Sequence, residues 1–182
     1  MNRRDFLKVS ALLSAAGLIP KPVRAAVPPR VVVVGGGFAG ATVAKYLRLW
    51  GGAIDVTLVE EGASHHACIL SNLVVTGQLP VERIVLGYQN LEGSHGVRRV
   101  QGRAVGVDAG ARSLAVETAS GRIALPYDRL VLAPGIDFIE PAGSYNPELT
   151  PHAWKAGPQT LLLRSKLSGM VSAGGTFVLS IP

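Results

Sequence analysis

The chain has 182 residues, a formal net charge of +6 and one cysteine, Cys68. Residues 1–25 contain five basic residues and one acidic residue, which is +4 of that charge, so the remainder carries only +2. Its basic residues are scattered and its aromatic residues do not alternate with them, which excludes the basic face of a nucleic-acid-binding protein. A single cysteine excludes an internal disulfide or a CxxC metal site in this chain, and we expect no metal site.

The first 25 residues have the pattern of an export signal. Arg3 and Arg4 precede an apolar stretch, residues 9–20, which is too short for the roughly 20 residues that a membrane-spanning helix needs. Small residues near the end of the segment suit cleavage after Ala25. The arginine pair resembles the bacterial twin-arginine signal, which implies export of an already folded protein. We therefore expect a periplasmic location and no integral membrane segment.

The next unit is predicted to be β-α-β. Residues 31–34 are four valines, typical of a parallel strand buried on both faces. A glycine-rich turn follows, then a predicted helix at residues 38–50 and a second strand at residues 54–59. This order predicts a Rossmann-like α/β domain with a parallel sheet.

The glycine-rich turn has the GxGxxG spacing of a dinucleotide-binding motif. In this motif the first glycine allows a tight turn, the second lets the pyrophosphate approach the backbone, and the third allows close packing of the helix. The helix N-terminus then offers amide donors to the phosphates. The residues expected to contact the dinucleotide here are Gly35, Gly37, Phe38, Ala39 and Gly40. Glu60, 20 residues after Gly40, is predicted to bind ribose hydroxyls, with Glu61 as the alternative.

The pattern changes after residue 60. Beyond a short helix at residues 69–75, the predicted elements are a β-meander at residues 97–103, 113–118 and 122–126, a strand from residue 127 into a Pro134-Gly135 turn, a helix at 159–170 and a strand at 174–180. We predict an FAD-binding domain over residues 26–140, a connector and helix over 141–173, and the incomplete start of a second nucleotide-binding-like domain over 174–182.

This order of elements resembles the two-dinucleotide-binding-domain flavoproteins, the glutathione reductase-like class. The resemblance implies that the first domain binds FAD and that the later domain binds NAD(P)H or is a relic of one that does. It also implies that Ala133-Pro134-Gly135 contacts the FAD and that Ala104 or Val105 faces the adenine. The chain would then hold only the first part of such an enzyme.

A narrower resemblance rests on Glu60-Glu61, on His65-His66-Ala67-Cys68 with Ser71-Asn72, and on residues 151–157. These resemble the flavoprotein subunit of flavocytochrome c sulfide dehydrogenase. The resemblance implies FAD attached covalently through Cys68, sulfide as the substrate and a c-type cytochrome subunit as the partner. The His65–Ala67 segment departs from the aromatic and hydroxyl residues of that family. The family's redox disulfide uses two further cysteines, so catalysis is incomplete in this chain.

Other interpretations stay open. FAD could be noncovalent, as in sulfide:quinone or NAD(P)H reductases, or the chain could be a non-catalytic flavin-binding module. Cys68 could be a buried, inert small side chain. His65 and His66 are interpreted as solvated loop residues rather than metal ligands.

Overall fold

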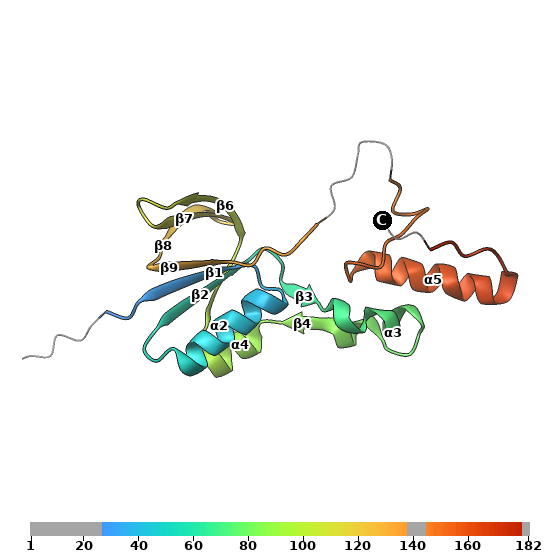
Figure 1. The fold of residues 1–182 in the computed structure, drawn as a ribbon, viewed down its shortest axis with the longest axis horizontal. Helices are drawn as coiled ribbons and strands as arrows, with labels where there is room; N and C mark the ends of the chain where they lie inside the picture. Colours follow the sequence, from blue (N-terminus) through green and yellow to red (C-terminus); the bar gives the residue numbers. More distant parts are fainter. Residues whose placement is uncertain (1–26, 138–144, 180–182) are drawn as a thin grey trace, which may run out of the picture.

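Four parallel strands form the central sheet of the protein, in the order β5-β2-β1-β9 (Figure 1). The fold is known from a computed structural model, which describes residues 27–137 and 145–179. The four strands are β1 (Arg30–Val34), β2 (Asp55–Glu60), β5 (Arg98–Gln101) and β9 (Arg129–Leu132). The parallel α/β fold predicted from the sequence is confirmed.

The valine run of β1 is buried on both faces of this sheet. Val31 and Val33 face helix α2 (Phe38–Trp50) and pack with its Ala44. Val32, between them, points to the opposite face and packs against the meander. Because successive side chains of a strand alternate between faces, four consecutive apolar residues require a cover on each side. The helix and the meander are those two covers.

The meander begins later than the sequence predicted. It consists of β6 (Arg103–Asp108), β7 (Ser113–Thr118) and β8 (Gly121–Pro126), all antiparallel. The single strand predicted at residues 97–103 is wrong. β5 pairs with β2 in the parallel sheet, and the chain then passes through Gly102 into the second sheet. A Cβ at Gly102 would overlap the Glu117 carbonyl oxygen, so the crossing requires glycine.

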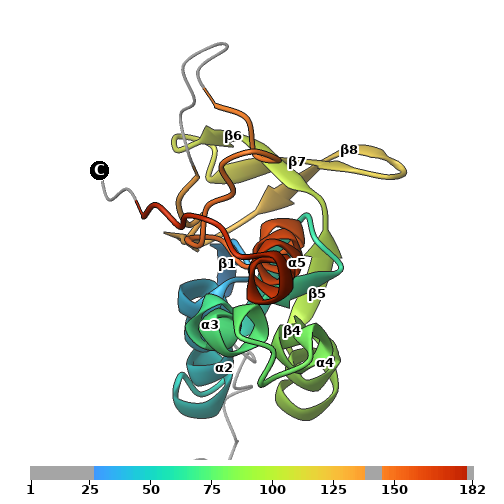
Figure 2. The same cartoon turned by 90° about the vertical axis from the view of Figure 1, so that its right-hand side faces the viewer.

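A second part of the molecule extends from the carboxyl edge of the sheet along a two-stranded antiparallel ribbon (Figure 1). The elements here are β3 (Ser64–His66), the 3-10 helix η1 (Cys68–Leu70), α3 (Ser71–Val75), the 3-10 helix η2 (Val81–Ile84) and β4 (Val85–Gly87). Helix α5 (Pro158–Ala173) lies beside α3, and α4 (Gln89–His95) lies beside α2 (Figure 2). Ala67, Val74 and Ile84 form a small separate core between these segments.

One further expectation, the strand predicted at residues 174–180, is wrong. Residues 174–179 contain no strand in the described part of the chain, because no neighbouring strand lies there to pair with them. The predicted signal, residues 1–25, lies outside the described residues, and the proposed domain division stays a prediction. Within residues 27–137 and 145–179, no helix is both long and apolar enough to cross a membrane.

Candidate functional site

The glycine-rich turn joins β1 to α2 at the carboxyl edge of the sheet, and two of its glycines are required by close backbone contacts. Gly35 has φ +97°, and a Cβ there would overlap the carbonyl oxygen of Ala133. A Cβ at Gly40 would overlap the carbonyl oxygen of Gly35. Gly35 therefore lets the turn lie against the end of β9, and Gly40 lets α2 lie against the turn.

Gly37 is different, because no neighbour among the described residues requires a glycine there. Its φ of −70° suits any residue, and the atom nearest to a Cβ would be His65 Cε1 at 3.6 Å. Gly37 is also the N-cap of α2. Within the described residues, that N-terminus has no side-chain cap and no acidic residue in its first turn. The amides of Phe38 and Ala39 can thus serve a bound phosphate, so the turn fits the pyrophosphate of a dinucleotide.

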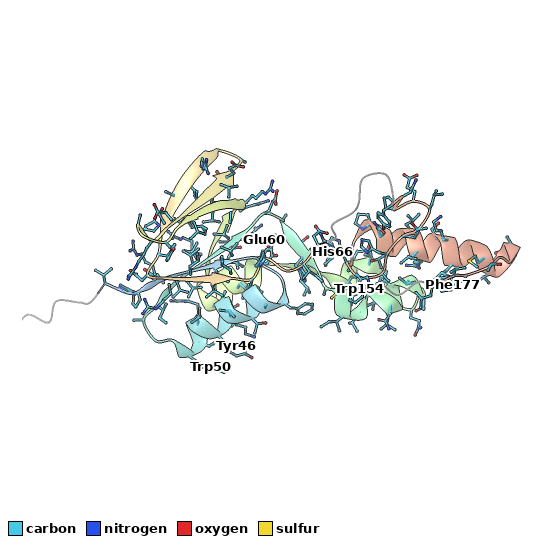
Figure 3. All side chains as sticks on the ribbon, turned by 45° about the horizontal axis from the view of Figure 1, so that its top comes forward. Tyr46, Trp50, Glu60, His66, Trp154 and Phe177 are labelled. Atoms are coloured by element: carbon cyan, nitrogen blue, oxygen red, sulfur yellow. The ribbon has the colours of Figure 1, made fainter. Side chains whose placement is uncertain are left out.

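Glu60 ends β2 and holds the turn through its carboxylate. Oε2 accepts a hydrogen bond from the Gly36 amide at 2.5 Å, and Oε1 accepts one from the Gly62 amide at 2.9 Å. A carboxylate has further lone pairs for ribose hydroxyls. Glu61 is exposed and only its carbonyl is engaged, by Gln101 Nε2 at 3.2 Å. Of the two acidic residues, Glu60 is the one beside the turn (Figure 3).

Two residues that the sequence did not predict complete this arrangement. The Tyr88 hydroxyl donates to the Gly36 carbonyl at 3.0 Å, and Arg99 Nη2 donates to the Gly62 carbonyl at 2.7 Å. The Arg99 guanidinium lies 4.8 Å from the centre of the Tyr88 ring. Glu60 holds the amides of the same two glycines, so the contacts close into a ring, which we call the Glu60–Tyr88–Arg99 ring. The ring fixes the backbone amides and carbonyls of Gly36 and Gly62 beside the predicted ribose site.

The Tyr88 hydroxyl stays a hydrogen-bond donor at any physiological pH. Burial raises the pKa of Tyr88 to about 12, and the negative charge of Glu60 acts in the same direction, while Arg99 opposes both. A phenol that ionises is lost as a donor, so this shift preserves the bond to Gly36.

The other predicted site residues are placed as follows. The Ala133 amide donates to the Val34 carbonyl at 2.8 Å, and Gly135 follows with φ +80°. Ala104 packs against the core between sheet and meander, and Val105 is half-buried at a β-bulge. Cys68 is exposed at the start of η1, which contradicts the interpretation of a buried, inert thiol. In the structure the glycine turn, Glu60 and Ala133 lie together, whereas Cys68 lies beyond β3, at the start of η1.

The interpretation of His65 and His66 as solvated loop residues is wrong, since both lie in β3 and are half-buried. His65 lies in β3, is half-buried, and meets the Phe38 ring edge-on at 5.5 Å between ring centres. With Gly36, Gly37 and Tyr88 it lines a cavity of about 410 Å³ beside the start of α2. His66, also half-buried, lies next along β3 toward the second part of the molecule (Figure 3). No group of three or more His, Cys, Asp or Glu side chains in the described ranges could hold a metal ion.

Comparison with known proteins agrees with this geometry. Residues 29–155 match the pyridine nucleotide-disulphide oxidoreductase family. Over 45 residues the chain is 58% identical to the flavoprotein chain of sulfide dehydrogenase (flavocytochrome c) from Chlorobaculum thiosulfatiphilum, a stretch that covers 25% of this chain and 94% of that sequence.

Solved structures show the same fold. A NAD-dependent persulfide reductase from A. fulgidus is 25% identical, with a TM-score of 0.56 over 62% of this chain. The sulfide:quinone oxidoreductase of Aquifex aeolicus is 20% identical, with a TM-score of 0.61 over 79% of this chain. The matched region spans only 23% and 32% of those two chains.

These similarities agree with the site in three respects. The family match spans the sheet, the glycine turn and the meander. The 45-residue stretch with 58% identity belongs to a flavoprotein, and the turn with Glu60 beside it fits a dinucleotide. FAD is therefore the cofactor of this site, and the chain belongs to the pyridine nucleotide-disulphide oxidoreductase family, as an FAD-dependent oxidoreductase.

Proposed function

We propose that this chain is the FAD-binding part of a periplasmic sulfide dehydrogenase, which passes electrons from sulfide through the flavin to a c-type cytochrome subunit. The observation that carries the proposal is the 58% identity to the sulfide dehydrogenase flavoprotein chain. The name of that relative includes flavocytochrome c, which supports a cytochrome partner.

Different residues of the chain would bind different parts of FAD. The amides at the start of α2 bind the pyrophosphate, and Glu60 binds the ribose. Ala133 and Gly135, just after β9, would contact the FAD, and Ala104 or Val105 on strand β6 would face the adenine. Bound FAD supplies an acceptor for two electrons that can release them one at a time.

Cys68 is the residue we propose to tether the flavin. Its thiol is exposed at the start of η1, and its carbonyl accepts a hydrogen bond from Ser71 Oγ at 2.7 Å, which fixes the first turn. Cys68 follows His65, which lines the cavity beside the turn, by three residues, and three extended residues span at most roughly 10 Å. The thioether would replace one C–H bond of a flavin methyl group with a C–S bond, and the flavin itself would accept the two electrons and the two displaced hydrogens. The exposed position of Cys68 leaves its thiol accessible for this reaction.

We expect flavin to stay with the protein after acid precipitation. A noncovalent flavin leaves when the fold is lost, because its contacts depend on tertiary structure, but a thioether survives. Mass analysis of the pellet measures the bond directly. Cys68→Ser should release the cofactor into the supernatant while the native protein stays yellow, since the exposed side chain supports no core. Flavin found wholly in the wild-type supernatant would contradict the tether and favour the quinone or nicotinamide reductases.

The periplasmic location rests on the paired arginines at positions 3 and 4. We expect Arg3→Lys with Arg4→Lys to leave the protein in the cytoplasm at its full length. Cell fractionation and the mass of the N-terminal peptide measure both effects. The single variant Lys8→Arg keeps the charge and the arginine pair, so it is the control that should still be exported. A wild-type chain that stays cytoplasmic and unprocessed would rule out this location.

A further inference from the structure

The imidazole of His65 lies at the point where the predicted pyrophosphate meets the glycine turn. Relative to the position of a Gly37 Cβ, Cε1 is 3.6 Å away and Nδ1 is 3.9 Å away. The ring also packs edge-on against Phe38, the first residue of α2. A group bound in front of Gly37 and the α2 amides would therefore touch this ring.

One nitrogen of the ring lacks a hydrogen-bond partner. Nε2 is buried and, within residues 27–137 and 145–179, bonds to nothing. Leaving a buried polar atom unpaired is costly, and such atoms are uncommon in native proteins. A half-turn about χ2 exchanges Nε2 with Cε1, which brings Nε2 to the edge of the ring that faces Gly37. A phosphate oxygen there would be its partner.

The charges around His65 come from three neighbouring elements. Glu60 at the end of β2 favours the charged imidazole, and His66 on β3 disfavours it. Lys45 of α2 and the neutral Tyr88 line the same cavity. Desolvation is the largest effect and lowers the pKa of His65 below its ordinary 6.5, so the ring is neutral at pH 7 without a ligand. A pyrophosphate brings two negative charges, which stabilise the imidazolium.

We propose that His65 binds the pyrophosphate of FAD as an imidazolium, so that each FAD molecule that binds takes one proton from the solvent onto this ring. The inference rests on the FAD-binding function proposed above. The GxGxxG motif does not predict this role, because His65 lies outside the motif. Strand β3 brings its side chain beside the turn.

The sign of the pH dependence follows from the two protonation states. Below the pKa of the free protein, His65 is charged with or without FAD, and above the pKa of the complex it is neutral in both. Between these limits FAD binding takes up a proton, so affinity rises as the pH falls, by up to about tenfold per pH unit.

The test is calorimetric titration of FAD into the flavin-free Cys68→Ser chain, in which binding is reversible. Buffers of different ionisation enthalpy report the protons taken up, between about pH 6 and about pH 8. We expect close to one proton per FAD near the middle of this range. His65→Gln keeps a hydrogen-bond donor without a titrating group, and it should lose both the uptake and the slope. At the acidic end it should bind about tenfold to a hundredfold more weakly, as expected for one charge-assisted bond.

His66→Gln is the matched control. His66 is the next residue on β3, and because strand side chains alternate it projects to the other face. The His66→Gln variant should show the same proton uptake and the same pH dependence of FAD affinity as the Cys68→Ser parent. Urea unfolding of each flavin-free variant separates lost binding from lost folding. Proton uptake that persists in His65→Gln, or a parent that binds FAD without uptake, would overturn the inference. A parent chain that folds and binds no FAD would instead contradict the FAD-binding function itself.

Discussion

A chain carrying Gly37→Val is expected to fold normally and to bind no FAD. The backbone at Gly37 has an ordinary φ of −70°, and the nearest neighbour of an added Cβ, at 3.6 Å, is a side-chain atom of His65. The flavin-free fold therefore tolerates a side chain, which fills the space in front of the α2 amides. Because the pyrophosphate must approach this backbone, we expect FAD affinity to fall by at least about a hundredfold.

Visible absorbance of the purified protein and urea unfolding of the flavin-free form measure the two effects. Gly169→Ala is the control, because no described atom lies within 4 Å of its added Cβ and α5 lies away from β1 and α2 (Figure 1). That variant should be yellow and slightly more stable, since alanine favours a helix over glycine. A yellow Gly37→Val protein would show that the pyrophosphate lies elsewhere.

Gly35→Ala should act on the fold itself. Its φ of +97° disfavours any side chain, and its Cβ would overlap the Ala133 carbonyl oxygen. We expect a loss of about 2–5 kcal/mol in the free energy of unfolding, from a backbone conformation unfavourable for alanine and from the displacement of packed backbone. Urea unfolding of the flavin-free chain measures it.

Gly52→Ala separates those two causes. Gly52 has φ +70°, and no atom of residues 27–137 or 145–179 lies within 4 Å of an added Cβ. Only the conformational cost remains there, roughly 1–2 kcal/mol. Equal losses at Gly35 and Gly52 would mean that the contact between the turn and the end of β9 contributes nothing to stability.

The first β-α-β unit could be predicted from the sequence because its signals are local. Four valines, a glycine turn and a helix closed by Gly51 follow one another without interruption, and each specifies one conformation. The observed strands and helix differ from the predicted bounds by a residue at most. Glu60 was found by its spacing alone, and its carboxylate lies against the turn.

The run at residues 97–103 shows where local pattern is insufficient. Its composition suits one strand, yet its two halves belong to different sheets. Gly102 was the available signal, since a glycine inside a strand often marks a bend. Helix α4 was missed because it is only seven residues long and contains Gly93. Gly96, with φ +63°, is the C-cap of α4 and was the one local signal for the end of this helix.

Tyr88, Arg99 and His65 could not be assigned to the site from the sequence. Tyr88 bonds to Gly36 across 52 residues, and Arg99 bonds to Gly62 across 37. Neither pairing has a fixed spacing, because the chain between the two partners includes the second part of the molecule. A residue that contacts the site only through tertiary structure leaves no periodicity to detect. His65 was judged by the polar character of its neighbours, although the ribbon with β4 half-buries it.

The contact between Gly35 and Ala133 also determines when the site can form during folding. The two residues are 98 positions apart, as are Arg30 and Asp128 at the other end of the same pair of strands. Closing so long a loop is slow, because its entropy is lost before the contact is gained. During synthesis on the ribosome, the glycine turn emerges early but has no strand to close against until β9 has been made. We therefore expect the chain to acquire its flavin only after β9 has been made.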